Sequence, residues 1–177
     1  NEPHVTLLED HSSPETIDGP SNNNQEQHDL GCDILTSSLA HLFPNSDKND
    51  VKVLDVGCGR GGFLLSAKKA GFEVCGVEAI SSAHKELDVK NIKIYNKLES
   101  VSRPVNTITF WHSLEHINDL NQTLILCRKL LKDKGMLIVA VPNYGSFDAK
   151  YYKSFWAAYD VPRHRFHFNK KGLIFTF

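Results

Sequence analysis

Apolar residues follow two different spacings in the middle of the chain, and the two spacings alternate. Short runs rich in Val, Ile, Leu and Phe are typical of buried strands, and the segments between them carry apolar residues every three or four positions, as on one face of a helix. The runs predict strands at 51–56, 72–78, 92–96, 105–111 and 136–142. The other segments predict helices at 32–43, 62–70, 80–88 and 119–135, with Gly71 and Gly135 as the stops of the second and fourth helices.

This alternation of strands and helices predicts an α/β fold. Right-handed crossovers between successive strands give a doubly wound, mostly parallel sheet with helices on both faces. Such a sheet usually carries further strands after 142, so the fold is expected to lack its last strands, and 169–177 is expected to begin another helix or strand. We place the domain at 30–177, incomplete at its C-terminus, and expect the polar segment 1–29 to be poorly ordered.

Composition narrows the choice of partners. The formal net charge of −1 gives no reason to expect nucleic acid, and the absence of a long apolar run argues against a membrane span. The four cysteines, which are scattered along the chain without a CxxC pair, are expected to be isolated thiols of a reducing compartment. These observations favour a cytoplasmic protein and leave its oligomeric state open.

The segment Asp55-Val-Gly57-Cys-Gly59-Arg-Gly61 joins a predicted strand to a predicted helix, which is where a nucleotide-type cofactor binds. With the next residue included, Gly57-Cys-Gly59-Arg-Gly61-Gly62 also fits GxGxxG, a loop that usually holds a pyrophosphate at the following helix N-terminus. The carboxylate of Asp55 would repel phosphate and suits a ligand that carries a cation. The plainest alternative is a tight turn before a helix.

At this point the sequence resembles the class I S-adenosylmethionine-dependent methyltransferases, whose first motif reads acid-x-Gly-x-Gly-x-Gly. The resemblance implies that Gly57, Gly59 and Gly61 let the backbone approach the methionine and adenosyl parts of S-adenosylmethionine, and that Asp55 helps to fix its ammonium group. Glu78 ends the second predicted strand, where an acid can accept hydrogen bonds from both ribose hydroxyls. Taken alone, Glu78 could equally be a solvated acid at a strand end.

Later segments extend the resemblance over about Val51 to Leu173: "TFWHSLEHINDL", "LLKDKGMLIVAVPN" and "WAAYDVPRHRFHFNKKGL". They imply methyl transfer to an oxygen, nitrogen or carbon nucleophile of a small molecule. Trp111, His112 and Ser113, at the end of a middle strand, are expected to lie beside the methionine part of the cofactor.

The letters His112-x-x-Glu115-His116 also spell HxxEH, a zinc-protease motif. That chemistry needs both histidines on one face of a regular helix, whereas here the motif directly follows a strand and is expected on a strand-to-helix bend. No metal site is therefore predicted. His116 is the candidate general base, or alternatively a residue that braces the loop, and Glu115 is expected to cap or brace the next helix.

The segment "YYKSFWAAYDVPRHRFH" supplies the candidate acceptor residues Tyr159, Arg163 and His164. Helical spacing would place Tyr151, Phe155 and Tyr159 on one stripe and Tyr152 and Trp156 on its neighbour, as the wall of an acceptor site or as a helix packed on the sheet. The basic run 163–167 could bind an anionic group, form a metal cluster or be a plain polar loop.

Two other functions fit parts of the pattern. An NAD-dependent oxidoreductase agrees with GxGxxG and Glu78 but not with Asp55. A non-catalytic cofactor-binding or scaffold protein agrees with the lack of a compelling catalytic residue on the acceptor side.

Overall fold

In this computed structural model, which describes residues 4–8, 22–80, 87–88 and 90–176, a six-stranded sheet forms the centre of the molecule. Its strand order is β1-β6-β5-β2-β3-β4, and every neighbouring pair is parallel. The strands are β1 (His4–Leu8), β2 (Lys52–Val56), β3 (Glu73–Val77), β4 (Lys93–Tyr95), β5 (Val105–Trp111) and β6 (Leu131–Ala140). The predicted doubly wound parallel sheet is confirmed, and β5 has the bounds expected from the sequence.

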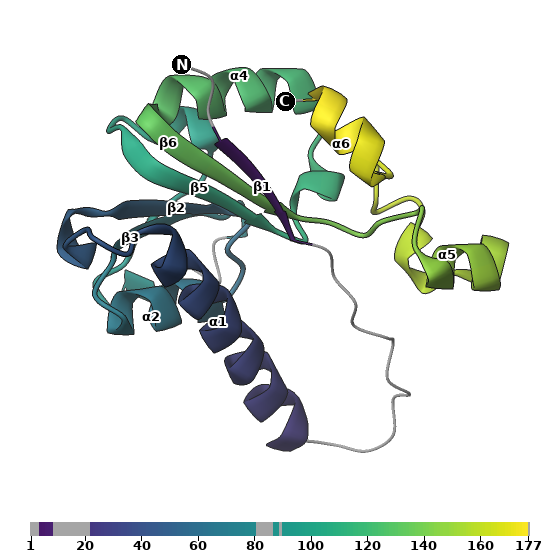
Figure 1. Cartoon of the computed structure of the whole chain (residues 1–177), viewed down its shortest axis with the longest axis horizontal. Coiled ribbons are helices and arrows are strands. Elements are labelled where there is room, and N and C mark those ends of the chain that lie inside the picture. The colour runs from purple at the N-terminus through teal and green to yellow at the C-terminus, as the bar shows by residue number, and fades with distance from the viewer. Residues whose placement is uncertain (1–3, 9–21, 81–86, 89, 177) are drawn as a thin grey trace.

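Helices cover both faces of the sheet (Figure 1), because the strands carry apolar residues on both sides. On one face, Leu54, Ile108 and Phe110 pack with residues of α4 (Leu120–Leu130). On the other face, Val53 and Ile138 pack with α1 (Asn22–Leu42) and α2 (Gly62–Lys69). None of the described helices is long and apolar enough to cross a membrane. The four cysteines are buried, and no disulfide joins them in the described part of the chain.

The helix predicted at 119–135 ends earlier than expected. The structure ends α4 at Leu130, and β6 begins at the next residue. Leu131 pairs with Val105, and a register shift follows between Val105 and Thr107. Gly135 lies in this irregular start of the strand, where a Cβ would come 2.8 Å from the Lys132 carbonyl oxygen. The glycine therefore permits a close backbone approach inside β6 and does not stop the helix.

Parts of two elements lie within the N-terminal segment 1–29, whose expected poor order stays a prediction. β1 pairs with β6 from His4 beside Met136 to Leu8 beside Ala140, and α1 already begins at Asn22. Residues 1–3 and 9–21 lie outside the described residues, as does most of the helix predicted at 80–88. The domain boundary at residue 30 stays a prediction.

The expectation of a single aromatic helix from 151 to 160 is wrong. α5 (Phe147–Tyr152) ends where Lys153 adopts a φ of 52°, and two short 3₁₀ turns follow, η4 (Lys153–Phe155) and η5 (Ala157–Tyr159). Phe155 is 89% exposed and Tyr151 is 68% exposed, so this segment is not a helix packed on the sheet. The last described element is α6 (Lys170–Thr176), which follows the expectation of a further element there.

Candidate active site

The loop between β2 and α2 holds three glycines with positive φ: Gly57 at 77°, Gly59 at 52° and Gly61 at 75°. Gly57 and Gly61 also sit where a side chain has no room. A Cβ on Gly57 would come 2.5 Å from Cβ of Ser113, and one on Gly61 would overlap the Leu87 side chain. The amides of Gly57 and Cys58 both donate to the carbonyl of Val77, which fixes the loop against β3.

Gly59 has a different environment. A Cβ built on it would meet no atom of the described residues within 4 Å. Its amide donates to Oε2 of Glu78 at 3.0 Å. At Gly59 the loop therefore leaves its backbone accessible, and the carboxylate of Glu78 from the end of β3 lies beside it.

Asp55 is a buried carboxylate inside β2. Its side chain is 3% exposed, and its Oδ1 accepts a hydrogen bond of 2.7 Å from the Thr109 hydroxyl on β5. Burial raises the pKa of Asp55 from 3.8 to about 7; the Thr109 hydrogen bond lowers it and the nearby Glu78 charge raises it further. A carboxylate in this setting gains from a cation beside it.

Glu78 lies directly after β3, as predicted, and is half-buried. Its Oε2 accepts from the Gly59 amide, and its Oε1 accepts from the Ile80 amide at 2.9 Å. Each carboxylate oxygen can accept more than one hydrogen bond. The carboxylate is therefore held in place by backbone donors and still has acceptor capacity for a ligand hydroxyl.

The end of β5 brings Trp111, His112 and Ser113 next to the glycine loop, since β5 is the sheet neighbour of β2. The Ser113 hydroxyl donates to the Val56 carbonyl, which ties the two strand ends together. The Trp111 ring packs edge-on against Phe63 of α2, with ring centroids 5.2 Å apart. His112 adopts a φ of 50° and its amide donates to the Ala140 carbonyl, so the chain turns sharply here.

A 3₁₀ turn, η3 (Leu114–His116), follows that bend, so the HxxEH letters do not lie on a regular helix, as expected. Glu115 does not cap the next helix, however, which was one of its two expected roles. The side chain that caps α4 is Asp119, which accepts from the Gln122 amide. Glu115 is instead 1% exposed, and neither carboxylate oxygen has a hydrogen-bond partner among the described residues.

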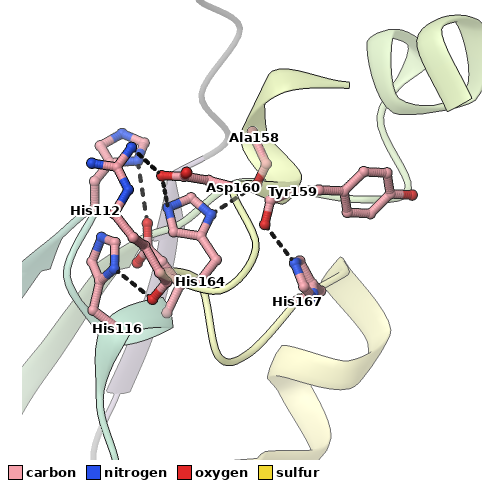
Figure 2. Close-up of polar contacts among 9 residues, drawn as sticks. His112, His116, Ala158, Tyr159, Asp160, His164 and His167 are labelled. Carbon is pink, nitrogen blue, oxygen red and sulfur yellow. Dashed lines mark hydrogen bonds and ion pairs between the residues drawn. The ribbon is translucent and has the colours of Figure 1, made fainter. Parts of the chain in front are cut away.

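The segment 158–167 docks onto η3 (Figure 2). The amides of Arg165 and Phe166 both donate to the Glu115 carbonyl, at 2.8 and 3.2 Å. This brings His164 against His116, with ring centroids 4.7 Å apart. The candidate base and one candidate acceptor residue, far apart in sequence, are therefore neighbours in the structure.

The two other candidate acceptor residues have different settings. Arg163 is an exposed residue whose guanidinium pairs with Asp160 at 2.5 Å. Tyr159 is half-buried, and its carbonyl accepts from Nε2 of His167 at 2.9 Å. Compensation of the Arg163 charge by Asp160 weakens the reading of 163–167 as an anion site.

Sequence reasoning missed Thr109 and the burial of Glu115. A signal for Thr109 existed: Thr107, Thr109 and Trp111 alternate along β5, and Thr109 is the register partner of Asp55. The burial of Glu115 had no such signal, because it comes from the docking of a segment distant in sequence.

Comparison with known proteins adds three findings. The sequence profile of a family described as methyltransferase domain matches residues 26–174. A ubiquinone biosynthesis O-methyltransferase of Rickettsia bellii is 27% identical over 108 residues, which cover 55% of this chain and 45% of that protein. The chain spans about half the length of the curated relatives it matches.

Among solved structures, the magnesium protoporphyrin IX methyltransferase of Synechocystis with bound SAH superimposes with a TM-score of 0.66 at 15% identity, covering 90% of this chain and 77% of that one. The plantazolicin methyltransferase in complex with SAH gives a TM-score of 0.64 at 19% identity, covering 87% of this chain and 64% of that one. At these identities the two structures establish a shared fold.

Proposed function

This chain belongs to the family of methyltransferase domains, and from that premise we propose that it transfers the methyl group of S-adenosylmethionine to an oxygen, nitrogen or carbon nucleophile of a small molecule. The cofactor supplies a methyl group activated by its positively charged sulfur. The residues described above would hold the cofactor, orient the acceptor and accept a proton.

The glycine loop fits such a cofactor. Open backbone at Gly59 leaves room for a ligand to approach the main chain, which a side chain at that position would block. We assign the methionine and adenosyl parts to Gly57, Gly59 and Gly61, and the ribose to Glu78. The carboxylate of Glu78, oriented by the Gly59 and Ile80 amides, is a suitable acceptor for hydroxyl groups.

The observation that carries the proposal is the buried carboxylate of Asp55 at this loop. Burial raises the pKa of Asp55 to about 7, and the one hydrogen bond that its side chain makes among the described residues comes from Thr109. An ammonium group beside it would stabilise the ionised form and offset the cost of burial. A pyrophosphate would have the opposite effect, so the site favours a cationic ligand over a dinucleotide.

The acceptor is assigned to the side formed by η3 and the segment 158–167. The carbonyl of Arg163 accepts from Nδ1–H of His116 at 3.1 Å, which leaves Nε2 of His116 as the basic nitrogen. We propose His116 as the general base and Tyr159, Arg163 and His164 as acceptor contacts, with Trp111, His112 and Ser113 between acceptor and cofactor. Alignment of donor and acceptor supplies much of the rate in such a transfer.

A cytoplasmic location is also proposed, because the four cysteines are buried free thiols.

Calorimetric titration with S-adenosylhomocysteine, the expected product, tests the cofactor site. Asp55→Asn keeps the shape of the side chain and removes its charge. We expect micromolar binding by the wild type and a loss of at least about tenfold, or about 1.4 kcal/mol, in the variant. Asp133→Asn is the matched control, because Asp133 is exposed at the opposite end of a parallel strand.

A parallel titration with NADH separates the alternatives. Binding of NADH in place of S-adenosylhomocysteine by the folded protein would contradict the proposal and support an oxidoreductase. Binding of S-adenosylhomocysteine without methyl transfer to any acceptor in a screen would support a non-catalytic role instead.

A further inference from the structure

Glu115, His116 and His164 converge at one point on the acceptor side. Each offers one ligand atom, and these atoms all lie within 4.8 Å of one another. We propose that they form a binding site for a divalent transition-metal ion of the zinc class. The proposal departs from the sequence-based expectation of no metal, and it uses His164 where the HxxEH letters would have used His112.

The buried carboxylate is the first observation in favour. Glu115 is 1% exposed, and no described residue donates a hydrogen bond to either of its oxygens. The nearest basic group that it faces is Nδ1 of His112, 3.8 Å from Oε1, which is beyond hydrogen-bond distance. A buried carboxylate without donors is costly, and a bound cation is one of the few ways to compensate it.

The two imidazoles are oriented as metal ligands usually are. The carbonyl of Arg163 faces Nδ1 of His116 at 3.1 Å, and the carbonyl of Ala158 faces Nδ1 of His164 at 2.8 Å. A carbonyl can only accept, so each Nδ1 carries the proton and each Nε2 carries the lone pair. Metal-binding histidines characteristically donate their other ring N–H to a backbone carbonyl in this way. Figure 2 shows His116 and His164 side by side in this arrangement.

The ligand types select the metal. Two neutral imidazoles and one carboxylate suit Zn²⁺ and its neighbours in the first transition row, whereas Mg²⁺ and Ca²⁺ prefer oxygen ligands throughout. The carboxylate of Asp160 lies 3.8 Å from Nε2 of His164 and is a further oxygen donor at the edge of the group. Such an ion would join η3 to the docked segment and hold the acceptor side together.

The metal site goes beyond the proposed function and changes one part of it. An ion bound at Nε2 of His116 would occupy the lone pair that a general base needs. Metal binding and cofactor binding use different residues, so the failure of one proposal is distinguishable from the failure of the other.

Titration of the chelator-treated full chain with Co²⁺ tests the site directly, because Co²⁺ bound by nitrogen and oxygen ligands shows visible absorption bands. We expect binding by the wild type, displacement of Co²⁺ by Zn²⁺, and no displacement by a large excess of Mg²⁺. Glu115→Gln and His164→Gln should each weaken Co²⁺ binding by at least about tenfold, or about 1.4 kcal/mol. His167→Gln is the matched control: it lies on the same segment, bonds to the Tyr159 carbonyl and is outside the proposed ligand set.

Circular dichroism of each variant verifies its fold, and His116→Gln provides a third ligand variant if another fails to fold. A folded wild type that binds neither Co²⁺ nor Zn²⁺ at micromolar concentration would overturn the proposal. So would folded ligand variants that bind Co²⁺ as tightly as His167→Gln does.

Discussion

At the scale of single residues, Asp55 links the stability of the molecule to pH. Its pKa is about 7 in the folded state against the ordinary aspartate value of 3.8, chiefly because the side chain is buried. Between these two pH values the folded state holds a proton that the unfolded state has lost. Stability contributed by protonated Asp55 is therefore fully present below pH 3.8 and is lost as the pH rises toward 7.

We expect Asp55→Asn to gain stability relative to the wild type over that pH range in the absence of cofactor. The full difference is roughly 4 kcal/mol as an upper bound. Urea denaturation of both proteins at a series of pH values measures it, and titrating groups that do not interact with Asp55 cancel in the comparison. A difference that does not change with pH would show that Asp55 ionises as easily in the folded protein as in the unfolded chain.

Two threonines of β5 offer a matched pair for measuring the value of the Asp55 hydrogen bond. Thr107 and Thr109 are both fully buried, but the Thr109 hydroxyl donates to Asp55, whereas Thr107 Oγ1 has no hydrogen-bond partner among the described residues. We expect Thr109→Val to destabilise the protein by about 1–3 kcal/mol, because it leaves the buried carboxylate without its donor. Thr107→Val should be neutral or stabilising. Equal losses in the two variants, measured by denaturation, would mean that the hydrogen bond contributes nothing specific.

At the scale of elements, two glycines of the loop between β2 and α2 are expected to have different roles: Gly57 in folding and Gly59 in ligand binding. Gly57→Ala forces a Cβ to within 2.5 Å of Ser113, whereas the same change at Gly59 meets open space. Both positions have positive φ, so each alanine also carries backbone strain of about 1–2 kcal/mol.

We expect Gly57→Ala to lower the free energy of unfolding clearly more than Gly59→Ala does. Gly59→Ala should remain folded and lose affinity for S-adenosylhomocysteine, because its methyl group points into space that the ligand would occupy. Denaturation and calorimetry on the two variants distinguish these effects. Normal affinity in Gly59→Ala would place the ligand away from this backbone.

The elements that the sequence predicted well are those whose local pattern and tertiary environment agree. β5 and α2 carry regular apolar spacing, and their apolar residues are buried in the core. The structure ends α2 at Lys69, two residues before the predicted stop at Gly71, which has a φ of 101°. The end of α4 was missed because Leu131 pairs with Val105, a contact that helical spacing at 131 does not reveal. The aromatic segment after Phe147 was missed because its spacing imitates a helix that Lys153 interrupts.

The residues of the candidate site also differ in how well the sequence predicts their proximity. Asp55, the glycines and Glu78 lie at strand ends, so a parallel sheet brings them together by its topology alone. The neighbourhood of Glu115, His116 and His164 depends on how the segment 158–167 folds back onto η3, and no periodicity encodes that return.

At the scale of the whole molecule, the short edge strand β1 covers one side of β6, a strand twice its length, by pairing with it along the backbone. An unpaired strand edge is a template for association with another chain. We expect deletion of residues 1–8 to cause self-association that increases with protein concentration, as measured by light scattering. Deletion of residues 1–3 alone is the control, because it leaves all of β1 in place. An eight-residue deletion that stays as dispersed as the control would show that β1 does not protect this edge.

The attachment of the segment 158–167 to η3 has a consequence for the evolution of this domain. Arg165 and Phe166 attach to η3 through their amides and through the carbonyl of Glu115, and these main-chain groups are the same whatever side chains are present. Mutation can therefore alter the side chains of this segment without loosening its attachment. If these side chains contact the acceptor as proposed, selection for a new acceptor can proceed here while the proposed cofactor residues at the strand ends remain under separate constraint.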